Sequence, residues 1–344
     1  MKEQKPFKIL SIDGGGIRGV FPAMFLAKIE AELKAKGVEK TQIFQHFDLI
    51  CGTSTGGIIA IGLALGMPAS EIYKLYLDNA SAIFGSKKKG FIKKLKYSAH
   101  NRAGLEELIR AKYKRAFKQN IDPRLKDCKT NVCVPIYDLL NGAPSVLKNN
   151  YHPAFTRDFH IPAYKVALAT SSAPTYFDPY STTYTDLNGI ENSFANKVDG
   201  GVVANNPTLI GIIEAQKAFN RPLNELNVLS IGTGYCKYSD SVNSKKWGIN
   251  YWMLKDGKKR LIDLFMQAQS QQVENLVSLL HKGIGRSEVD NFIYSRIDTE
   301  LDETSNIALD ETNQDKLKRL SERATREFQV KGNEILNKHF LYTT

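Results

Sequence analysis

The sequence is poor in cysteine. Only four cysteines occur among 344 residues, at Cys51, Cys128, Cys133 and Cys236. Their spacing matches no zinc motif, and their density is far below that of a small scaffold held together by disulfides. We therefore expect reduced thiols in a cytoplasmic protein, with neither a metal nor another cofactor.

Long apolar runs are also missing. The longest, Ile58 to Leu65, is far shorter than the ~20 residues that cross a bilayer. The polar stretch from Met1 to Lys8 has no apolar h-region, so we expect no secretory signal. Any membrane contact is therefore expected to be peripheral, at the inner face of the membrane.

No histidine lies where a hydrolase with a catalytic triad would need it. None of the six is found in a setting like the late loop that supplies the histidine base of an α/β-hydrolase. His152 and His160 lie in a loop that contains proline, and His339 lies in the C-terminal tail. A serine hydrolase built on this chain would need a different base.

Negative charge is in short supply, because 47 Lys and Arg face 36 Asp and Glu, a net charge of +11. This surplus favours anionic partners such as phospholipid headgroups or nucleotides. A nucleic-acid polymer is not expected, since the chain lacks a recognition-helix or aromatic-stacking pattern. The basic stretch Lys87 to Lys96 contains Phe91, Ile92 and Leu95. It fits either a segment that docks on anionic membrane or a solvated loop.

Strand and helix patterns alternate through the first two thirds of the chain. This alternation predicts an open, mostly parallel sheet with helices on both faces, in a single unit over residues 1–344. A β-rich stretch is expected at 166–170, a loop region at 175–196, and a helical C-terminal region at about 255–344. The other expected strands cover 7–12, 47–51, 131–137 and 227–231, and the expected helices cover 22–36, 55–65 and 207–219.

Gly52-Thr53-Ser54-Thr55-Gly56 is the strongest local signal for chemistry. The pattern G-x-S-x-G between a strand and a helix is typical of a nucleophile elbow, in which a strained turn exposes the serine hydroxyl. The flanking glycines matter because larger side chains would clash in so tight a turn. The alternative is a glycine-rich turn in which Ser54 only caps the following helix.

A glycine-rich loop, Asp13-Gly14-Gly15-Gly16-Ile17-Arg18-Gly19, follows the first expected strand. Its G-x-G-x-x-G spacing also occurs in dinucleotide-binding folds, which makes an oxidoreductase an alternative. The acidic residue expected about 20 positions later has no clear candidate. Consecutive glycines can instead direct backbone N–H groups to one point and form an oxyanion hole. Arg18 fits either a phosphate contact or a structural salt bridge.

The third element is Asp199-Gly200-Gly201, which by itself is only a turn. It becomes a candidate base because no histidine is suitably placed. A Ser54–Asp199 dyad would need no histidine, provided that the two side chains lie close together.

Together, these three elements resemble the patatin-like phospholipase family. The motifs D-G-G-G-I-R-G, G-T-S-T-G-G and D-G-G occur in the family's order, and the resemblance covers about residues 7–234. It implies a three-layer α/β/α fold and hydrolysis of fatty acyl esters of membrane phospholipids without a metal. Ser54 would be the nucleophile, Asp199 the base, and Gly14, Gly15 and Gly16 the oxyanion loop.

The chain is also similar to bacterial patatin-like effectors of antiphage defence. That resemblance implies activation by a cyclic dinucleotide, although no motif identifies a pocket for it. The alternatives are a constitutive esterase or lysophospholipase, and a catalytically inactive lipid-binding module. The sequence leaves open whether the protein forms a homo-oligomer.

Overall fold

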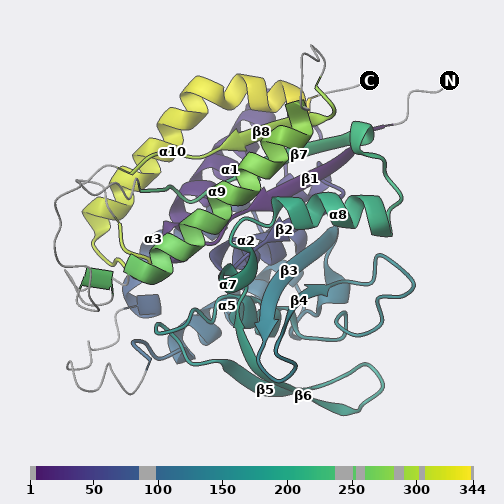
Figure 1. The fold of residues 1–344 in the computed structure, drawn as a ribbon, viewed down its shortest axis with the longest axis vertical. Helices are drawn as coiled ribbons and strands as arrows, with labels where there is room; N and C mark the ends of the chain where they lie inside the picture. The colour runs from purple at the N-terminus through teal and green to yellow at the C-terminus, as the bar shows by residue number, and fades with distance from the viewer. Residues whose placement is uncertain are drawn as a thin grey trace.

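The computed structural model describes residues 5–84, 98–236, 251–252, 260–282, 290–301 and 307–341. The Lys87 to Lys96 stretch lies outside these residues. An eight-stranded sheet forms the centre, in the order β5-β6-β3-β2-β1-β7-β8, with β4 paired to β3 (Figure 1). The strands are β1 (Phe7–Ile12), β2 (Leu49–Gly52), β3 (Asn131–Asp138), β4 (Ala143–Lys148), β5 (Tyr180–Thr185), β6 (Glu191–Asp199), β7 (Leu226–Ile231) and β8 (Ile293–Ile297).

The middle of the sheet is parallel. Strand β1 pairs in parallel with β2 on one side and β7 on the other, while β3 and β8 continue the parallel part outward. Strands β4, β5 and β6 add antiparallel pairs at one edge. Every residue of β1, β2 and β7 is buried, as expected for parallel strands covered on both faces.

Helices cover both faces of the sheet. Alternate strand residues enter separate cores: Leu10 packs against one helical layer and Ile9 against the other. The predicted three-layer α/β/α fold is therefore confirmed. The first layer comprises α1 (Val20–Ala35), α2 (Thr55–Ala64), α3 (Ala69–Phe84), α5 (Ala103–Phe117), α6 (Ala163–Thr170) and α10 (Gln314–Ile335). The second comprises α8 (Thr208–Ala218) and most of α9 (Arg260–Lys282), with the short α7 (Gly201–Ala204) beside them (Figure 1).

The expected β-rich stretch at 166–170 is wrong, because these residues belong to helix α6. A short apolar run fits a buried strand or a buried helix equally well, so periodicity could not decide. All of α6 except Lys165 is buried, and its alanines allow close packing beneath α2.

The loop expected at 175–196 is also wrong over most of its length. Strands β5 and β6 form an antiparallel hairpin there, closed by a turn between Asp186 and Ile190. Strand β5 alternates buried or half-buried residues with exposed ones, the period-2 pattern of a sheet edge with one solvated face. Its many Ser and Thr residues concealed that pattern in the sequence.

The C-terminal region is helical, as predicted, but it also contributes a strand that was not expected. Strand β8 pairs in parallel with β7, so that Asn227 lies opposite Ile293 and Ile231 opposite Ile297. Within the part of the chain that the structure describes, no helix is both long and apolar enough to cross a membrane.

Candidate active site

The three predicted elements converge at the carboxyl ends of the parallel strands. Ser54 follows β2, the glycine-rich loop follows β1, and Asp199 ends β6 opposite Ile136, near the end of β3. Strands β1 and β2 run in parallel and carry their following loops to one edge of the sheet, where sites of α/β folds lie. Strand β6 runs antiparallel, and its pairing with β3 brings Asp199 beside them. The topology thus brings together residues 145 positions apart in the sequence.

Ser54 occupies a strained turn between β2 and α2. Its backbone has φ 54° and ψ −122°, a conformation that residues with a side chain rarely adopt. The hydroxyl makes no capping bond to the N-terminus of α2, although Ser54 stands at the N-cap position. The capping alternative is therefore wrong, and the turn holds the hydroxyl for another contact.

Close backbone approach explains the glycines on either side of Ser54. A Cβ atom on Gly52 would lie 2.1 Å from the Gly56 carbonyl oxygen, and one on Gly56 would lie 2.1 Å from the Ile12 carbonyl oxygen. Neither backbone can move without shifting the elbow. Gly200 is equally crowded, since a Cβ there would lie 2.1 Å from the Pro135 carbonyl oxygen. Contacts with side chains are looser: a Cβ would lie 2.4 Å from Thr55 Oγ1 at Gly19 and 2.8 Å from the Met266 methyl carbon at Gly201.

The Ser54 hydroxyl donates a hydrogen bond to Asp199. Ser54 Oγ lies 2.7 Å from Asp199 Oδ2, and the two residues are 5% and 1% exposed. The other carboxylate oxygen, Oδ1, accepts the Gly201 N–H at 2.6 Å. Both oxygens are thus held in fixed directions, with one aimed at the serine proton.

Burial raises the pKa of the Asp199 carboxyl to about 7, and the hydrogen bonds from Gly201 and Ser54 only partly oppose this rise. Removal from water disfavours the ionised form of a carboxylic acid. A group with a pKa near 7 can accept a proton and return it at neutral pH, which suits general acid–base catalysis.

Thr170, the last residue of α6, links the turn that holds Ser54 to the loop that follows Asp199. Its Oγ1 accepts the Ser54 N–H at 3.0 Å and donates to the Pro135 carbonyl at 2.8 Å. Its own carbonyl accepts the Gly200 N–H at 3.2 Å. One threonine therefore fixes both the elbow and the loop after Asp199.

The glycine-rich loop packs beside Ser54 and is held from several sides. The Gly14 N–H donates to the Asn205 carbonyl at 2.9 Å, and the Gly14 carbonyl accepts the Thr233 hydroxyl at 2.8 Å. Gly16, with φ 56°, lines the same pocket as Ser54. Because the Gly14 amide is already engaged, Gly15 and Gly16 become the better candidates for oxyanion donors.

Arg18 lies in the 3-10 turn that follows this loop. Its Nε donates to the Gly15 carbonyl at 3.4 Å, a long bond within the loop itself. Among the described residues, no carboxylate lies within ion-pair distance of Arg18. The described residues thus offer Arg18 no salt-bridge partner, whereas its bond to the Gly15 carbonyl fits a role in bracing the loop.

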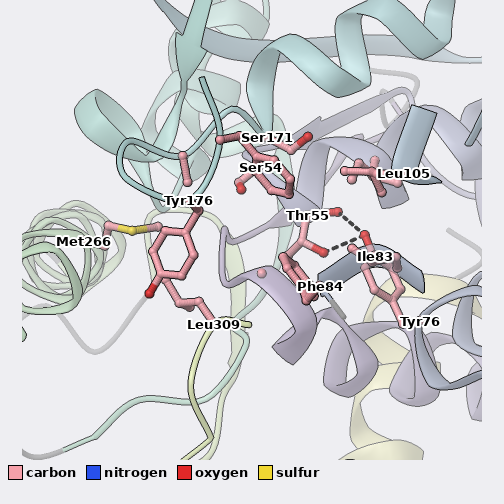
Figure 2. Close-up of a pocket in the computed structure, with 14 residues that line it drawn as sticks. Ser54, Thr55, Tyr76, Ile83, Phe84, Leu105, Ser171, Tyr176, Met266 and Leu309 are labelled. Carbon is pink, nitrogen blue, oxygen red and sulfur yellow. Dashed lines mark hydrogen bonds between the residues drawn. The ribbon is translucent and has the colours of Figure 1, made fainter. Parts of the chain in front are cut away.

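An apolar pocket opens over Ser54 (Figure 2). Thr55, next to Ser54, donates from its hydroxyl to Tyr76 OH at 2.6 Å, and Tyr76 OH in turn donates to the Thr55 carbonyl. The rest of the wall is almost entirely apolar and suits a hydrocarbon chain better than a charged group. Its apolar lining comprises Ile58, Ile83, Phe84, Leu105, Ala173, Tyr176, Phe177, Met266 and Leu309.

Arg296, on β8, is a residue of the site that the sequence did not reveal. Its guanidinium donates to both carboxylate oxygens of Asp13, at 2.9 and 2.7 Å, and to Asp298 at 2.7 Å. Asp298 in turn accepts the Gly234 N–H at 2.9 Å. Arg296 therefore joins the glycine-rich loop after β1 to the loop after β7.

We expect Arg296→Met to lower the free energy of unfolding by about 3–5 kcal/mol, because it leaves the buried Asp13 carboxylate without its counter-charge. Urea unfolding measures the loss. Arg110→Met is the matched control: it removes an arginine–aspartate pair with Asp122, but Arg110 is 48% exposed. That change should cost about 1 kcal/mol or less. Equal losses in the two variants would contradict the role given to Arg296.

Comparisons with known proteins find relatives of this chain. A family profile described as "Patatin-like phospholipase" matches residues 10–212. "Patatin-like protein 2" of Arabidopsis thaliana is 34% identical over 321 residues, covering 85% of this chain and 75% of the relative. A "cGAMP-activated phospholipase" of Escherichia coli (strain TW11681) is 33% identical over 345 residues, covering 97% and 92%. Among solved structures, VipD of Legionella pneumophila aligns with a TM-score of 0.47 at 13% identity, covering 98% of this chain and 67% of VipD.

Proposed function

The chain belongs to the patatin-like phospholipase family of carboxylic ester hydrolases, and from that premise we propose that it cleaves fatty acyl esters of membrane phospholipids with a Ser54–Asp199 dyad. The observation that carries the proposal is the 2.7 Å hydrogen bond from Ser54 Oγ to Asp199 Oδ2 at a strained elbow. The serine is thereby both exposed to the pocket and joined to a base.

In the proposed reaction, Asp199 takes the Ser54 proton as Oγ attacks the ester carbonyl carbon. The tetrahedral intermediate collapses, and the proton passes to the departing lysophospholipid alcohol. The fatty acyl group stays on Ser54 as an ester. Asp199 then takes a proton from water, whose oxygen attacks this ester. As the fatty acid leaves, Asp199 returns that proton to Ser54 Oγ, which restores the starting dyad. The raised pKa of Asp199 suits both proton transfers.

The glycine-rich loop supplies the electrostatic part of the proposal. Backbone N–H groups of Gly15 and Gly16 would stabilise the negative oxygen of the tetrahedral intermediate. Each such donor is worth on the order of 3 kcal/mol of transition-state stabilisation. The bracing by Thr233 and Arg296 supports this role, because an oxyanion hole works only when its donors are held in place beforehand.

The apolar pocket over Ser54 supports a fatty acyl substrate. We propose that the acyl chain lies along Ile58, Leu105 and Phe177, while the headgroup remains outside. Such a substrate requires contact with a membrane, and we propose that this contact is peripheral and at the inner face. The oxidoreductase alternative gains no support, since the chain belongs to a family of ester hydrolases.

Activation by a cyclic dinucleotide is the finer part of the proposal. It rests on two relatives named cGAMP-activated phospholipase, from Escherichia coli and Vibrio cholerae, which cover 97% and 93% of this chain. By this proposal the protein is an effector of antiphage defence that stays silent until the nucleotide binds and then degrades the host membrane.

The test is fatty acid release from phospholipid vesicles by the purified protein, with and without a panel of cyclic dinucleotides that includes cGAMP. We expect at least a tenfold increase with one member of the panel. A high rate that no cyclic dinucleotide changes would reject activation and leave a constitutive phospholipase. Failure to release fatty acid from any phospholipid or lysophospholipid, under every condition, would contradict the proposed hydrolase.

A further inference from the structure

Helix α9 exposes an uncharged face beside the site. Four large apolar side chains on it are open to solvent: Phe265 at 59%, Leu276 at 42%, Leu279 at 54% and Leu280 at 40%. From 261 to 280, the remaining exposed residues are alanine, glutamine and asparagine, while Asp263 and Glu274 are not exposed.

The lack of charge on this face of α9 contrasts with the other long helix of the molecule. Helix α10 has a similar length, and its exposed face carries Lys318, Arg319, Glu322 and Arg326, as expected for a helix in water. Exposed apolar side chains with no charge among them are typical of a surface that binds something.

The exposed residues form one stripe along the helix. At 100° per residue, Phe265, Leu276, Leu279 and Leu280 lie within about 100° of one another and extend about 22 Å along the helix. An amphipathic helix that lies flat on a membrane presents such a face to the boundary between headgroups and acyl chains.

The stripe begins at an opening to the catalytic base. Phe265, Gln269 and Gln272 line a second pocket, together with Val202, and this pocket reaches Asp199. Gln269 Nε2 donates to the Val202 carbonyl at 2.7 Å, which ties α9 to the segment after Asp199. In Figure 1, α9 crosses the front of the sheet, and no other helix or strand is drawn in front of it.

We propose that this α9 face (Phe265, Leu276, Leu279 and Leu280) docks the enzyme on the lipid surface and brings the opening beside Asp199 to the membrane. The inference rests on the proposed function, since a phospholipase must draw its substrate from a lipid surface. A second protein copy seated on the face would instead cover that opening. Because the face is uncharged, its contribution to docking should not depend on salt.

The experiment uses the full chain with Leu276→Glu and Leu279→Glu combined. Both residues lie outside the two pockets. The matched control is Val330→Glu, on α10, which adds a charge at another exposed apolar position, 75% exposed. Vesicle binding is measured in a Ser54→Ala background, so that it does not depend on hydrolysis. Phosphatidylcholine vesicles, with and without phosphatidylglycerol, are used at low and high salt.

We expect the double substitution to weaken binding to neutral phosphatidylcholine vesicles at least tenfold at both salt concentrations, while Val330→Glu changes it less than twofold. With Ser54 present, vesicle hydrolysis should fall in parallel, and turnover of a soluble short-chain ester should stay within twofold.

Three results would overturn the proposal. One is unchanged vesicle binding by the double variant. Another is binding that occurs only with phosphatidylglycerol and disappears in high salt, which would point to the Lys87 to Lys96 stretch. The third is a lower molar mass of the double variant than of the wild type, measured by light scattering, which would identify the face as an interface between two copies of the chain. If no variant hydrolyses lipid but the binding loss is observed, the docking face stands and the proposed function fails.

Discussion

Ser54→Ala is expected to reduce phospholipid hydrolysis by about 10⁴-fold or more while leaving the protein folded. The hydroxyl is the group that would form the acyl-enzyme, because the other hydroxyls of the elbow donate elsewhere: Thr53 to the Ala204 carbonyl and Thr55 to Tyr76. Losses of this order follow removal of the nucleophile in other serine hydrolases. Fatty acid release from vesicles measures the rate, and a fluorophosphonate probe should label the wild-type protein at residue 54 but not the variant.

Ser321→Ala is the matched control for this substitution. Ser321 is a serine of α10 that is also 5% exposed, and it bonds to the Leu317 carbonyl and to Tyr73, away from the site. Its loss should leave hydrolysis within a few-fold of wild type. Substantial activity in Ser54→Ala, or equal losses in the two variants, would overturn the assignment of the nucleophile.

The strained backbone at Ser54 also leads to a prediction about stability. A serine with φ 54° and ψ −122° stores backbone strain of about 1–3 kcal/mol. Ser54→Gly should release much of that strain, because glycine adopts positive φ without steric cost. We expect this inactive variant to unfold at a higher temperature than Ser54→Ala.

Asp199→Asn is expected to reduce hydrolysis by about 10⁴-fold, because the amide cannot accept the Ser54 proton. Asparagine has nearly the same shape and can still accept the Gly201 N–H, so the loop should keep its position. Asp138→Asn is the control: it changes a buried carboxylate of β3 that pairs with Lys197. That variant should keep most of its activity, and retained activity in Asp199→Asn would exclude a dyad.

The raised pKa of Asp199 fixes how activity depends on pH. The carboxylate is the active form, so kcat/KM should fall about tenfold for each pH unit below about 7. In contrast, a base with an ordinary aspartate pKa would keep full activity down to about pH 4. A profile that stays flat from pH 7 to pH 5 would contradict the environment described for Asp199.

The same pKa implies that ionised Asp199 costs stability. The folded protein binds this proton up to about pH 7, whereas the unfolded chain releases it near 3.8, so stability decreases as pH rises through that window. The difference corresponds to at most about 4 kcal/mol. Asp199→Asn removes the cost, and its advantage in unfolding temperature over wild type should grow from pH 4 to pH 7.

Local patterns predicted much of the fold. The strands at 7–12, 131–137 and 227–231 and the helices at 55–65 and 207–219 occur within one or two residues of their expected places. These segments are long or strongly patterned, and turns rich in glycine and proline bound them. Helix α6 and the hairpin of β5 and β6 were missed, because neither a short apolar run nor a polar edge strand has a period that decides its structure.

The sequence by itself determined where the elbow lies, since the pattern G-x-S-x-G around Ser54, between a strand and a helix, is typical of that turn. It made Asp199 a candidate only through motif order and the lack of a suitable histidine. The tertiary structure decided that the two side chains meet at 2.7 Å, that burial raises the pKa of the Asp199 carboxyl, and that Arg296 braces the glycine-rich loop. These properties depend on contacts between distant segments and on exclusion of water, which a linear pattern does not encode.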